Sequence, residues 1–247
     1  MDSFRQQKVV LGLAKRHAYP HKVSRVKIEE THISWIFLTG LYAYKIKKEL
    51  KFGKVLDFST LQSRKRLCQK EVRLNKILCS EMYKGVAKIV RGHKGNDNTD
   101  NSYNTDDIRI VSLKHRAKAL EYAVKMVEVP QKYRMDNLIS IGQVNSKTIE
   151  RLVETLIRFH HYTPTNAKIK SFGCPKSLKK KINENFDTLS KLAKVNPKFE
   201  KKLISFVKNN TDLFYQRIIE DKVRDIHGDL YLKNIFIVKI GSICTTE

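Results

Sequence analysis

The sequence predicts an α+β protein of two lobes, because strand-like segments concentrate in its first half and helical patterns fill the second. Its 247 residues, of which 41% are hydrophobic, suffice to bury one large core or two small ones. Pro130 ends the last strand-like run and lacks a backbone donor. We therefore predict a first lobe of residues 1–130, with an antiparallel sheet and one helix, and a mostly helical second lobe of residues 131–247.

Alternating or β-branched runs mark the strands of the first lobe. In residues 42–47 the alternation places Ala43, Lys45 and Lys47 on one strand face. Residues 92–107 are too polar to pack and are expected to form a loop. Strands are predicted at residues 26–28, 35–38, 42–47 and 86–90, and a hairpin at 108–113 and 120–129, of which the second strand is buried and central.

Helical periodicity accounts for the rest of the chain. Ser59 and Thr60 are N-cap candidates for the first-lobe helix, Ser146 is a candidate for a second-lobe helix, and Pro197 suits a first helical turn. Helices are predicted at residues 60–79, 135–141, 146–162, 175–195 and 197–221.

The chain is strongly basic, with 49 Lys plus Arg against 25 Asp plus Glu and a formal charge of +24. Such a charge attracts polyanions whether or not binding them is the function. The lysines are spread over the predicted helices, and no aromatic stacking residues are interleaved with them. A Lys-rich solvated surface is therefore favoured over a dedicated nucleic-acid footprint.

No apolar run approaches a membrane span, and the first residues lack the apolar region of a signal peptide. We therefore expect a cytoplasmic protein without a membrane partner. Cys68, Cys79, Cys174 and Cys244 form no C-x-x-C pair, which argues against a zinc cluster and a disulfide framework. Reduced thiols are the simplest expectation.

The octapeptide HGDLYLKN, residues 227–234, has the spacing of a kinase catalytic loop and precedes an apolar strand. In phosphoryl transfer, one carboxylate accepts the proton of the substrate hydroxyl, and a carboxamide five residues later binds a magnesium ion. Asp229 and Asn234 fit these parts. The alternative is an ordinary polar turn before a strand.

Six ordered segments together resemble an uncharacterised branch of the aminoglycoside phosphotransferase family, and they span almost the whole chain. They are residues 30–40 (ETHISWIFLTG), 42–48 (YAYKIKK), 56–61 (LDFSTL), 71–75 (EVRLN), 122–126 (YAVKM) and 223–230 (VRDIHGDL). The resemblance implies a two-lobed fold like that of protein kinases, with ATP and Mg²⁺ as cofactors and a small-molecule hydroxyl as acceptor. Gly228 stands where protein kinases usually carry Arg, which disfavours that family.

The resemblance also implies roles for single residues. Lys45 would bind the α and β phosphates, although Lys47 on the same strand face is a rival and either could be a solvated strand lysine. Glu71 would pair with Lys45, unless it is one more surface carboxylate. Asp229 would orient the acceptor hydroxyl and take its proton, and Asn234 would ligate magnesium.

Further positions are implied around these four. His227 would brace the catalytic loop by hydrogen bonding, and a core histidine satisfied by backbone is its plainer reading. Thr31, His32 and Ser34 lie where kinases place the phosphate-covering turn, although no Gly-x-Gly-x-x-Gly occurs here.

The adenine-binding hinge would be residues 126–129, in which Met126 contributes an apolar wall and Glu128 a backbone position. The alternative for this segment is simply a central buried strand.

The end of the chain departs from the family. The family continues through another short strand to a magnesium-binding aspartate and further helices, whereas here no Asp follows Asp229. A natural truncation, a frameshifted gene and a partial sequence would each read this way. We therefore keep a second hypothesis, a catalytically inactive kinase-like fragment or a basic nucleic-acid-binding module.

Overall fold

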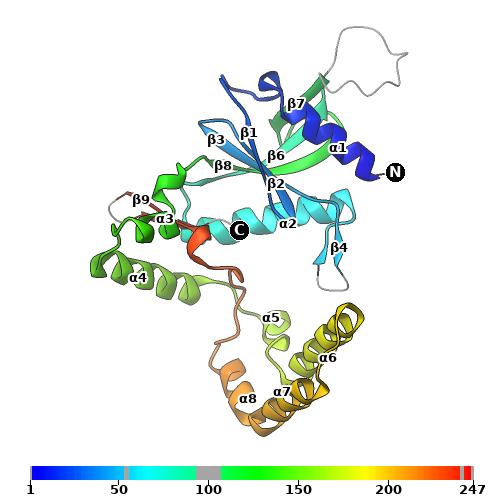
Figure 1. Ribbon diagram of the computed structural model, residues 1–247, viewed down its shortest axis with the longest axis vertical. Helices are drawn as coiled ribbons and strands as arrows, with labels where there is room; N and C mark the ends of the chain where they lie inside the picture. Colours follow the sequence, from blue (N-terminus) through cyan, green and yellow to red (C-terminus); the bar gives the residue numbers. More distant parts are fainter. Residues whose placement is uncertain (1, 53–55, 93–106, 240–241, 246–247) are drawn as a thin grey trace. The chain divides into compact units, whose positions relative to one another are not determined.

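The computed structural model describes residues 2–52, 56–92, 107–239 and 242–245, and it is a mixed α+β structure (Figure 1). Most of the predicted polar loop, residues 93–106, lies outside the described residues. The strands are β1 (Lys27–Glu30), β2 (Ser34–Leu38), β3 (Tyr42–Lys47), β4 (Lys51–Phe52), β5 (Leu56–Asp57), β6 (Tyr83–Arg91), β7 (Ile108–Ser112), β8 (Ala119–Val127), β9 (Ile235–Lys239) and β10 (Ser242–Thr245). The α-helices are α1 (Asp2–Leu13), α2 (Leu61–Leu78), α3 (Met135–Ser140), α4 (Ser146–Tyr162), α5 (Ala167–Ser171), α6 (Pro175–Leu192), α7 (Pro197–Asn209) and α8 (Thr211–Ile219).

The main sheet has six strands in the order β1-β2-β3-β8-β6-β7, and every neighbouring pair is antiparallel. This order corrects the predicted hairpin of β7 and β8, because β7 pairs with β6 and β8 lies between β3 and β6. The prediction that β8 is a central strand is confirmed. Its Ala123 and Val124 are both fully buried although they point to opposite faces, so the strand needs cover on both sides.

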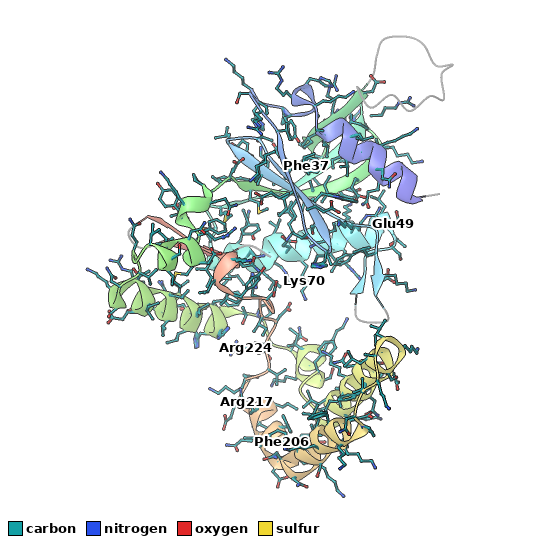
Figure 2. All side chains as sticks on the ribbon, viewed as in Figure 1. Phe37, Glu49, Lys70, Phe206, Arg217 and Arg224 are labelled. Atoms are coloured by element: carbon teal, nitrogen blue, oxygen red, sulfur yellow. The ribbon has the colours of Figure 1, made fainter. Side chains whose placement is uncertain are left out.

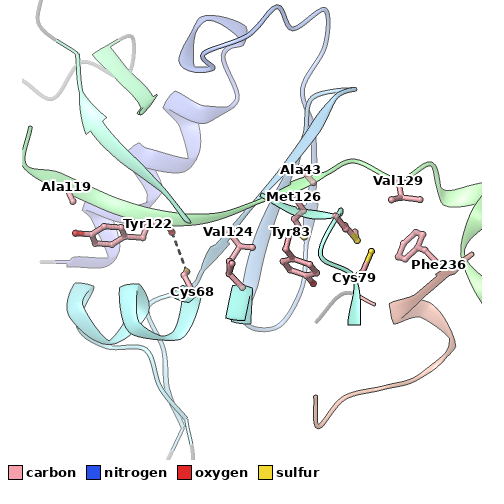
Figure 3. Packing of buried hydrophobic residues seen from close by; sticks show 12 residues of the cluster. Ala43, Cys68, Cys79, Tyr83, Ala119, Tyr122, Val124, Met126, Val129 and Phe236 are labelled. Carbon is pink, nitrogen blue, oxygen red and sulfur yellow. Dashed lines mark hydrogen bonds between the residues drawn. The ribbon is translucent and has the colours of Figure 1, made fainter. Parts of the chain in front are cut away.

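Two helices cover the two faces of this sheet (Figure 1). On one face, Val9 and Leu13 of α1 pack in a cluster with Phe37, Tyr44 and Ile46 of the sheet. On the other face, Cys68 and Val72 of α2 pack with Ala43, Tyr83, Val124 and Met126. Figure 3 shows this second cluster, in which the Cys68 thiol donates to the Tyr122 carbonyl over 4.0 Å. The predicted alternation of side chains along β3 is thus confirmed, because Ala43 lies on the α2 side of the sheet and Tyr44 on the α1 side.

Helix positions were predicted better than helix caps and breaks. Thr60 caps α2 as expected, because its hydroxyl accepts the N–H of Ser63 over 3.1 Å. Ser146 is not the cap of α4. Because α4 already begins at Ser146, Asn145 precedes it as the cap, and the Asn145 carboxamide accepts the Thr148 N–H over 3.0 Å. The helix predicted at residues 197–221 is two helices, α7 and α8, interrupted at Asn210. Helices α1 and α5 were not predicted, nor was β10, which pairs with β9.

The chain divides into two compact units. The first comprises Met1–Leu156 and His227–Glu247, and the second comprises Ile157–Ile226. These limits differ from those of the predicted lobes, whose division at residue 130 stays a prediction. The octapeptide of residues 227–234 therefore belongs to the same unit as the main sheet, although 99 residues separate it from β8 in the sequence.

The second unit buries few of its apolar side chains. Val207 of α7 is 4% exposed, whereas Phe199 and Phe206 on the same helix are 64% and 56% exposed. Phe206, labelled in Figure 2, meets the ring of Phe214 edge-on, with 6.4 Å between the ring centroids. The face of α7 that carries Val207 is thus the packed one, and the face that carries Phe199 is open.

Among the described residues, no helix has the length and apolar character needed to cross a membrane. Cys68 and Cys174 are free, whereas Cys79 is disulfide-bonded. The expectation that all thiols are reduced is therefore wrong at Cys79.

The two faces of α7 should respond differently to truncation. We expect Val207→Ala to lower the free energy of unfolding by about 2 kcal/mol, because it leaves a cavity in a packed site. Phe199→Ser, on the open face of the same helix, is the matched control and should change stability by less than about 0.5 kcal/mol. Calorimetric melting of both variants measures this, and equal losses would contradict the packing described here.

Candidate functional site

A pocket of about 430 Å³ opens beside the sheet in the first unit. Its volume falls within the range of ordinary ligand sites. Strand β3, the end of β8, the turn between β1 and β2, and the octapeptide segment all contribute to its wall. The lining residues are Glu29, Thr31, His32, Ile33, Ile36, Leu38, Ala43, Lys45, Met82, Met126, Val127, Glu128, Val129, Gln131, Arg134, Asp229, Tyr231, Lys233, Asn234 and Phe236.

One part of the pocket is apolar and preformed. Ala43, Met82, Met126 and Phe236 each belong to the core cluster beneath α2 and also line the pocket. All four are at most 5% exposed. Since these side chains are held by core packing, the slot they form does not depend on a ligand for its shape.

A buried carboxylate lies behind the pocket and binds two lysines. Lys45 Nζ lies 3.2 Å from Glu71 Oε1, and Lys47 Nζ lies 2.6 Å from Glu71 Oε2. The side chains of all three are at most 5% exposed. Glu71 projects from α2 and both lysines from the same face of β3. The predicted pair of Lys45 and Glu71 is therefore present, and its rival Lys47 binds the same carboxylate.

The charges around Glu71 overcome the cost of its burial. Burial by itself raises the pKa of a carboxyl group, but the ammonium groups of Lys45 and Lys47, by charge and hydrogen bonds, hold the pKa of Glu71 below its ordinary value. Glu71 is thus an anion inside the protein, and it keeps two cations beside it.

A second buried carboxylate, Glu121 of β8, shows the opposite balance. Its Oε2 accepts from Arg64 Nε over 2.9 Å and from Gln6 Nε2 over 2.9 Å. Burial nevertheless raises the pKa of Glu121 above its ordinary value, because these contacts lower it less than burial raises it. Gln6 of α1 also donates to the Lys47 carbonyl over 2.9 Å. Helix α1 is therefore anchored to β3 and β8 by a polar network that the sequence did not reveal.

The octapeptide brings two side chains together at the pocket. Asn234 Nδ2 donates to the backbone carbonyl of Asp229 over 2.9 Å and to its carboxylate over 3.2 Å. Asn234 is buried and Asp229 is exposed. The backbone N–H of Asp229 donates to His227 Nδ1 over 3.3 Å, and burial lowers the pKa of His227. A neutral imidazole can accept this bond through Nδ1.

The turn between β1 and β2 closes on itself. The Thr31 hydroxyl accepts the Ser34 N–H over 3.0 Å and donates to the Ser34 carbonyl over 3.2 Å. Ser34 is fully buried and does not line the pocket, whereas Thr31 and His32 do. In the turn between β2 and β3, the Gly40 N–H donates to the Glu128 carboxylate over 2.7 Å. Gly40 has a φ of 89°, a conformation that favours glycine.

The predicted site residues thus form one neighbourhood. Those that line the pocket are Thr31, His32, Lys45, Met126, Glu128, Asp229 and Asn234. Glu71, His227 and Ser34 lie behind it and contact Lys45, Asp229 and Thr31. Sequence reasoning missed Arg134, which lines the pocket and makes a bidentate ion pair with Asp136 at 2.6 and 2.9 Å. Its position just after the predicted hinge was the available signal. It also missed Lys233, although this residue lies inside the octapeptide.

No family model matches the chain, and no solved structure matches it. The chain is similar to the uncharacterized proteins Mb2027c of Mycobacterium bovis and Rv2004c of Mycobacterium tuberculosis, with 26% identity to each over 219 residues. The similar region covers 86% of this chain and 39% of each relative. The chain therefore spans about two fifths of the length of the curated relatives it matches.

The two buried carboxylates should give opposite pH dependences. The folded pKa of Glu71 is lowered, so its stabilising contribution is present above about pH 4.3 and is lost as the pH falls through the folded pKa. We expect Glu71→Gln to cost about 3 kcal/mol at neutral pH, because it leaves buried ammonium groups without their carboxylate. That cost should shrink on acidification.

Glu121→Gln is the matched control. The folded pKa of Glu121 is raised, so its contribution is present below about pH 4.3 and is lost as the pH rises through the folded pKa. The cost of this substitution should therefore grow on acidification. Urea denaturation of the wild type and both variants between about pH 3 and pH 8 measures the differences. Parallel curves for the two variants would contradict the charge balance described above.

Proposed function

We propose that this protein is an ATP- and magnesium-dependent phosphotransferase that acts on a hydroxyl group of a small molecule in the cytoplasm. The proposal includes a two-lobed kinase-like fold and kinship with the aminoglycoside phosphotransferase family. One observation carries it: a single pocket combines a carboxylate-paired buried lysine, an apolar slot and the Asp229–Asn234 pair. This combination meets the needs of phosphoryl transfer, in which positioning and charge stabilisation do most of the work.

The apolar slot suits a nucleobase. Ala43, Met82, Met126 and Phe236 offer apolar walls, and the end of β8 with the two residues after it, residues 127–129, also lines the pocket. The Val127 N–H is already bonded to the Met82 carbonyl, over 2.9 Å, and the Glu128 N–H to the Leu41 carbonyl, over 3.1 Å. The segment is therefore fixed before a base arrives, which lowers the entropic cost of binding.

Lys45 would bind phosphate. It lines the pocket from β3, and its ammonium group donates to the Glu71 carboxylate. A fixed cation at this position would neutralise the charge that develops as the γ-phosphoryl group leaves. The net charge of the chain, +24, would favour the approach of an anionic nucleotide.

The donor set of the octapeptide fits magnesium. Asn234 directs its Nδ2 to Asp229, so its carbonyl oxygen is available as a hard ligand beside the Asp229 carboxylate. The described residues contain no cluster of three or more His, Cys, Asp or Glu side chains that could hold a metal by themselves. Mg²⁺ bound with nucleotide needs no such cluster, because phosphate oxygens and water complete its coordination. Bound there, the ion would neutralise charge on the phosphates.

Asp229 would carry the proton transfer. Its carboxylate is exposed at the pocket and would accept the proton of the acceptor hydroxyl. The hydroxyl oxygen would then form a bond to the γ-phosphorus while the bond from that phosphorus to the β–γ bridging oxygen breaks, and ADP would leave. Asn234 and His227 would keep the Asp229 segment in place through the bonds described above.

Nucleotide binding should depend on magnesium and on the side chains of Lys45 and Asn234. We expect calorimetric titration with ATP to show binding that strengthens when Mg²⁺ is added. Lys45→Ala and Asn234→Ala should each weaken it at least about tenfold. Lys51→Ala removes a positive charge whose side chain is 65% exposed and outside the pocket, and it should leave the affinity unchanged.

Absence of binding to the folded wild type would refute the proposal. It would then favour the inactive fragment or basic nucleic-acid-binding module, which fluorescence titration with single-stranded and duplex oligonucleotides would detect.

Chemistry should depend on Asp229 more than binding does. We expect Asp229→Asn to lower phosphate transfer from ATP to hydroxyl acceptors at least about a hundredfold, because it removes the proton acceptor. Its affinity for ATP without metal should stay within about threefold of the wild type. Transfer of labelled γ-phosphate to a panel of sugars, amino alcohols, choline-like amines and aminoglycosides measures the first quantity. A variant that transfers phosphate at the wild-type rate would exclude Asp229 from this role.

A further inference from the structure

Two lysines of one strand share a single buried carboxylate, and they bind it unequally. Lys47 Nζ lies 2.6 Å from Glu71 Oε2, whereas Lys45 Nζ lies 3.2 Å from Oε1. Hydrogen bonds between an ammonium and a carboxylate are usually about 2.8 Å long. The short contact therefore belongs to Lys47, and the contact of Lys45 is long for such a pair.

The two lysines also differ in what else they reach. Lys45 lines the pocket, and Lys47 is not among its lining residues in the described part of the chain. Lys47 instead points toward Phe58, whose ring centroid lies 5.4 Å from its ammonium group. It is 4% exposed. The lysine with the stronger hold on Glu71 is thus the one without access to a ligand in the pocket.

This division has an electrostatic consequence. An anionic ligand at Lys45 competes with Glu71 for the ammonium group, because both are negatively charged hydrogen-bond acceptors. If Glu71 had Lys45 as its principal partner, a ligand that drew Lys45 away would leave a buried carboxylate poorly compensated, which is costly. With Lys47 retaining its short contact, Glu71 stays compensated when Lys45 turns to the ligand.

We propose that Lys47 is a positioning residue that holds Glu71 from the side opposite the pocket and so makes the Lys45 charge available to the phosphates of a bound nucleotide. This inference rests on the function proposed above. A purely structural lysine would affect stability and would change affinity for charged and uncharged ligands alike. Loss of a positioning residue changes the ratio between the affinity for a ligand that carries phosphate and the affinity for one that does not.

The test compares ATP with adenosine, which presents the same base and sugar without phosphates. We expect Lys47→Met, which keeps the length of the side chain and removes its charge, to lower the ratio of ATP affinity to adenosine affinity about tenfold. Adenosine affinity itself should stay within about twofold. Lys47→Arg, which restores the charge, should recover most of the ratio. Both ligands are titrated by calorimetry with Mg²⁺ present.

A double-mutant cycle separates action through Glu71 from a direct effect of the Lys47 charge on the nucleotide. The cycle compares Lys47→Met in the wild type and in Glu71→Gln. If Lys47 acts through Glu71, its removal changes the affinity ratio by less than about twofold when the carboxylate is already absent. An equal, additive loss in both backgrounds would overturn the inference while leaving the phosphotransferase proposal intact.

The other outcomes are also decisive. A wild-type protein that binds neither ATP nor adenosine refutes the proposed function and this inference with it.

If Lys47→Met fails to fold, nuclear magnetic resonance of the lysine side chains in the wild type replaces the affinity measurement. The signals are assigned through Lys45→Arg and Lys47→Arg. Addition of ATP should then shift the Lys45 signal and leave that of Lys47 nearly in place. Equal shifts would overturn the positioning role.

Discussion

A single buried negative charge, that of Glu71, sets the constraint on which the candidate site depends. An ion inside a protein is tolerated only when it is paired and hydrogen-bonded. Glu71 meets this condition through Lys45 and Lys47, which lie two positions apart on the same face of β3. Sliding or rotating α2 against the sheet would separate these charges, so the pairing selects one arrangement of helix and strand. The lysine that reaches the pocket is placed by the same contacts.

A second polar network connects the sheet that carries this pair to both α1 and α2. Gln6 of α1 bonds to the Lys47 carbonyl and to Glu121, and Arg64 of α2 reaches the same carboxylate. Both helices are therefore connected to β3 and β8 by directional bonds as well as by apolar packing. The two carboxylates differ in their surroundings: Glu71 has two close cations, while Glu121 has one guanidinium, the Gln6 amide and the Tyr122 N–H. The contacts of Glu71 together outweigh burial and lower its pKa, whereas those of Glu121 do not, so the pKa of Glu121 is raised.

The composition of the pocket supports the proposed function more directly than similarity to the mycobacterial proteins does. The mycobacterial relatives share 26% of the aligned residues, and this chain spans only part of their length. An α+β architecture with an antiparallel sheet is likewise compatible with many activities. What narrows the choice is the meeting of Lys45, Asp229, Asn234 and an apolar slot in one cavity.

Local patterns in the sequence determined the main strands, the limits of α4, the common face of Lys45 and Lys47, and the Asp229–Asn234 spacing. Each of these depends on neighbours within a few residues, where side-chain periodicity and hydrogen-bonding geometry act directly. Only the tertiary structure decided that β8 separates β3 from β6, that Lys47 shares Glu71 with Lys45, and that Gln6 reaches Glu121. These contacts join residues from 24 to 115 positions apart in the chain. They follow from the competition of all buried polar groups for partners, which no local pattern records.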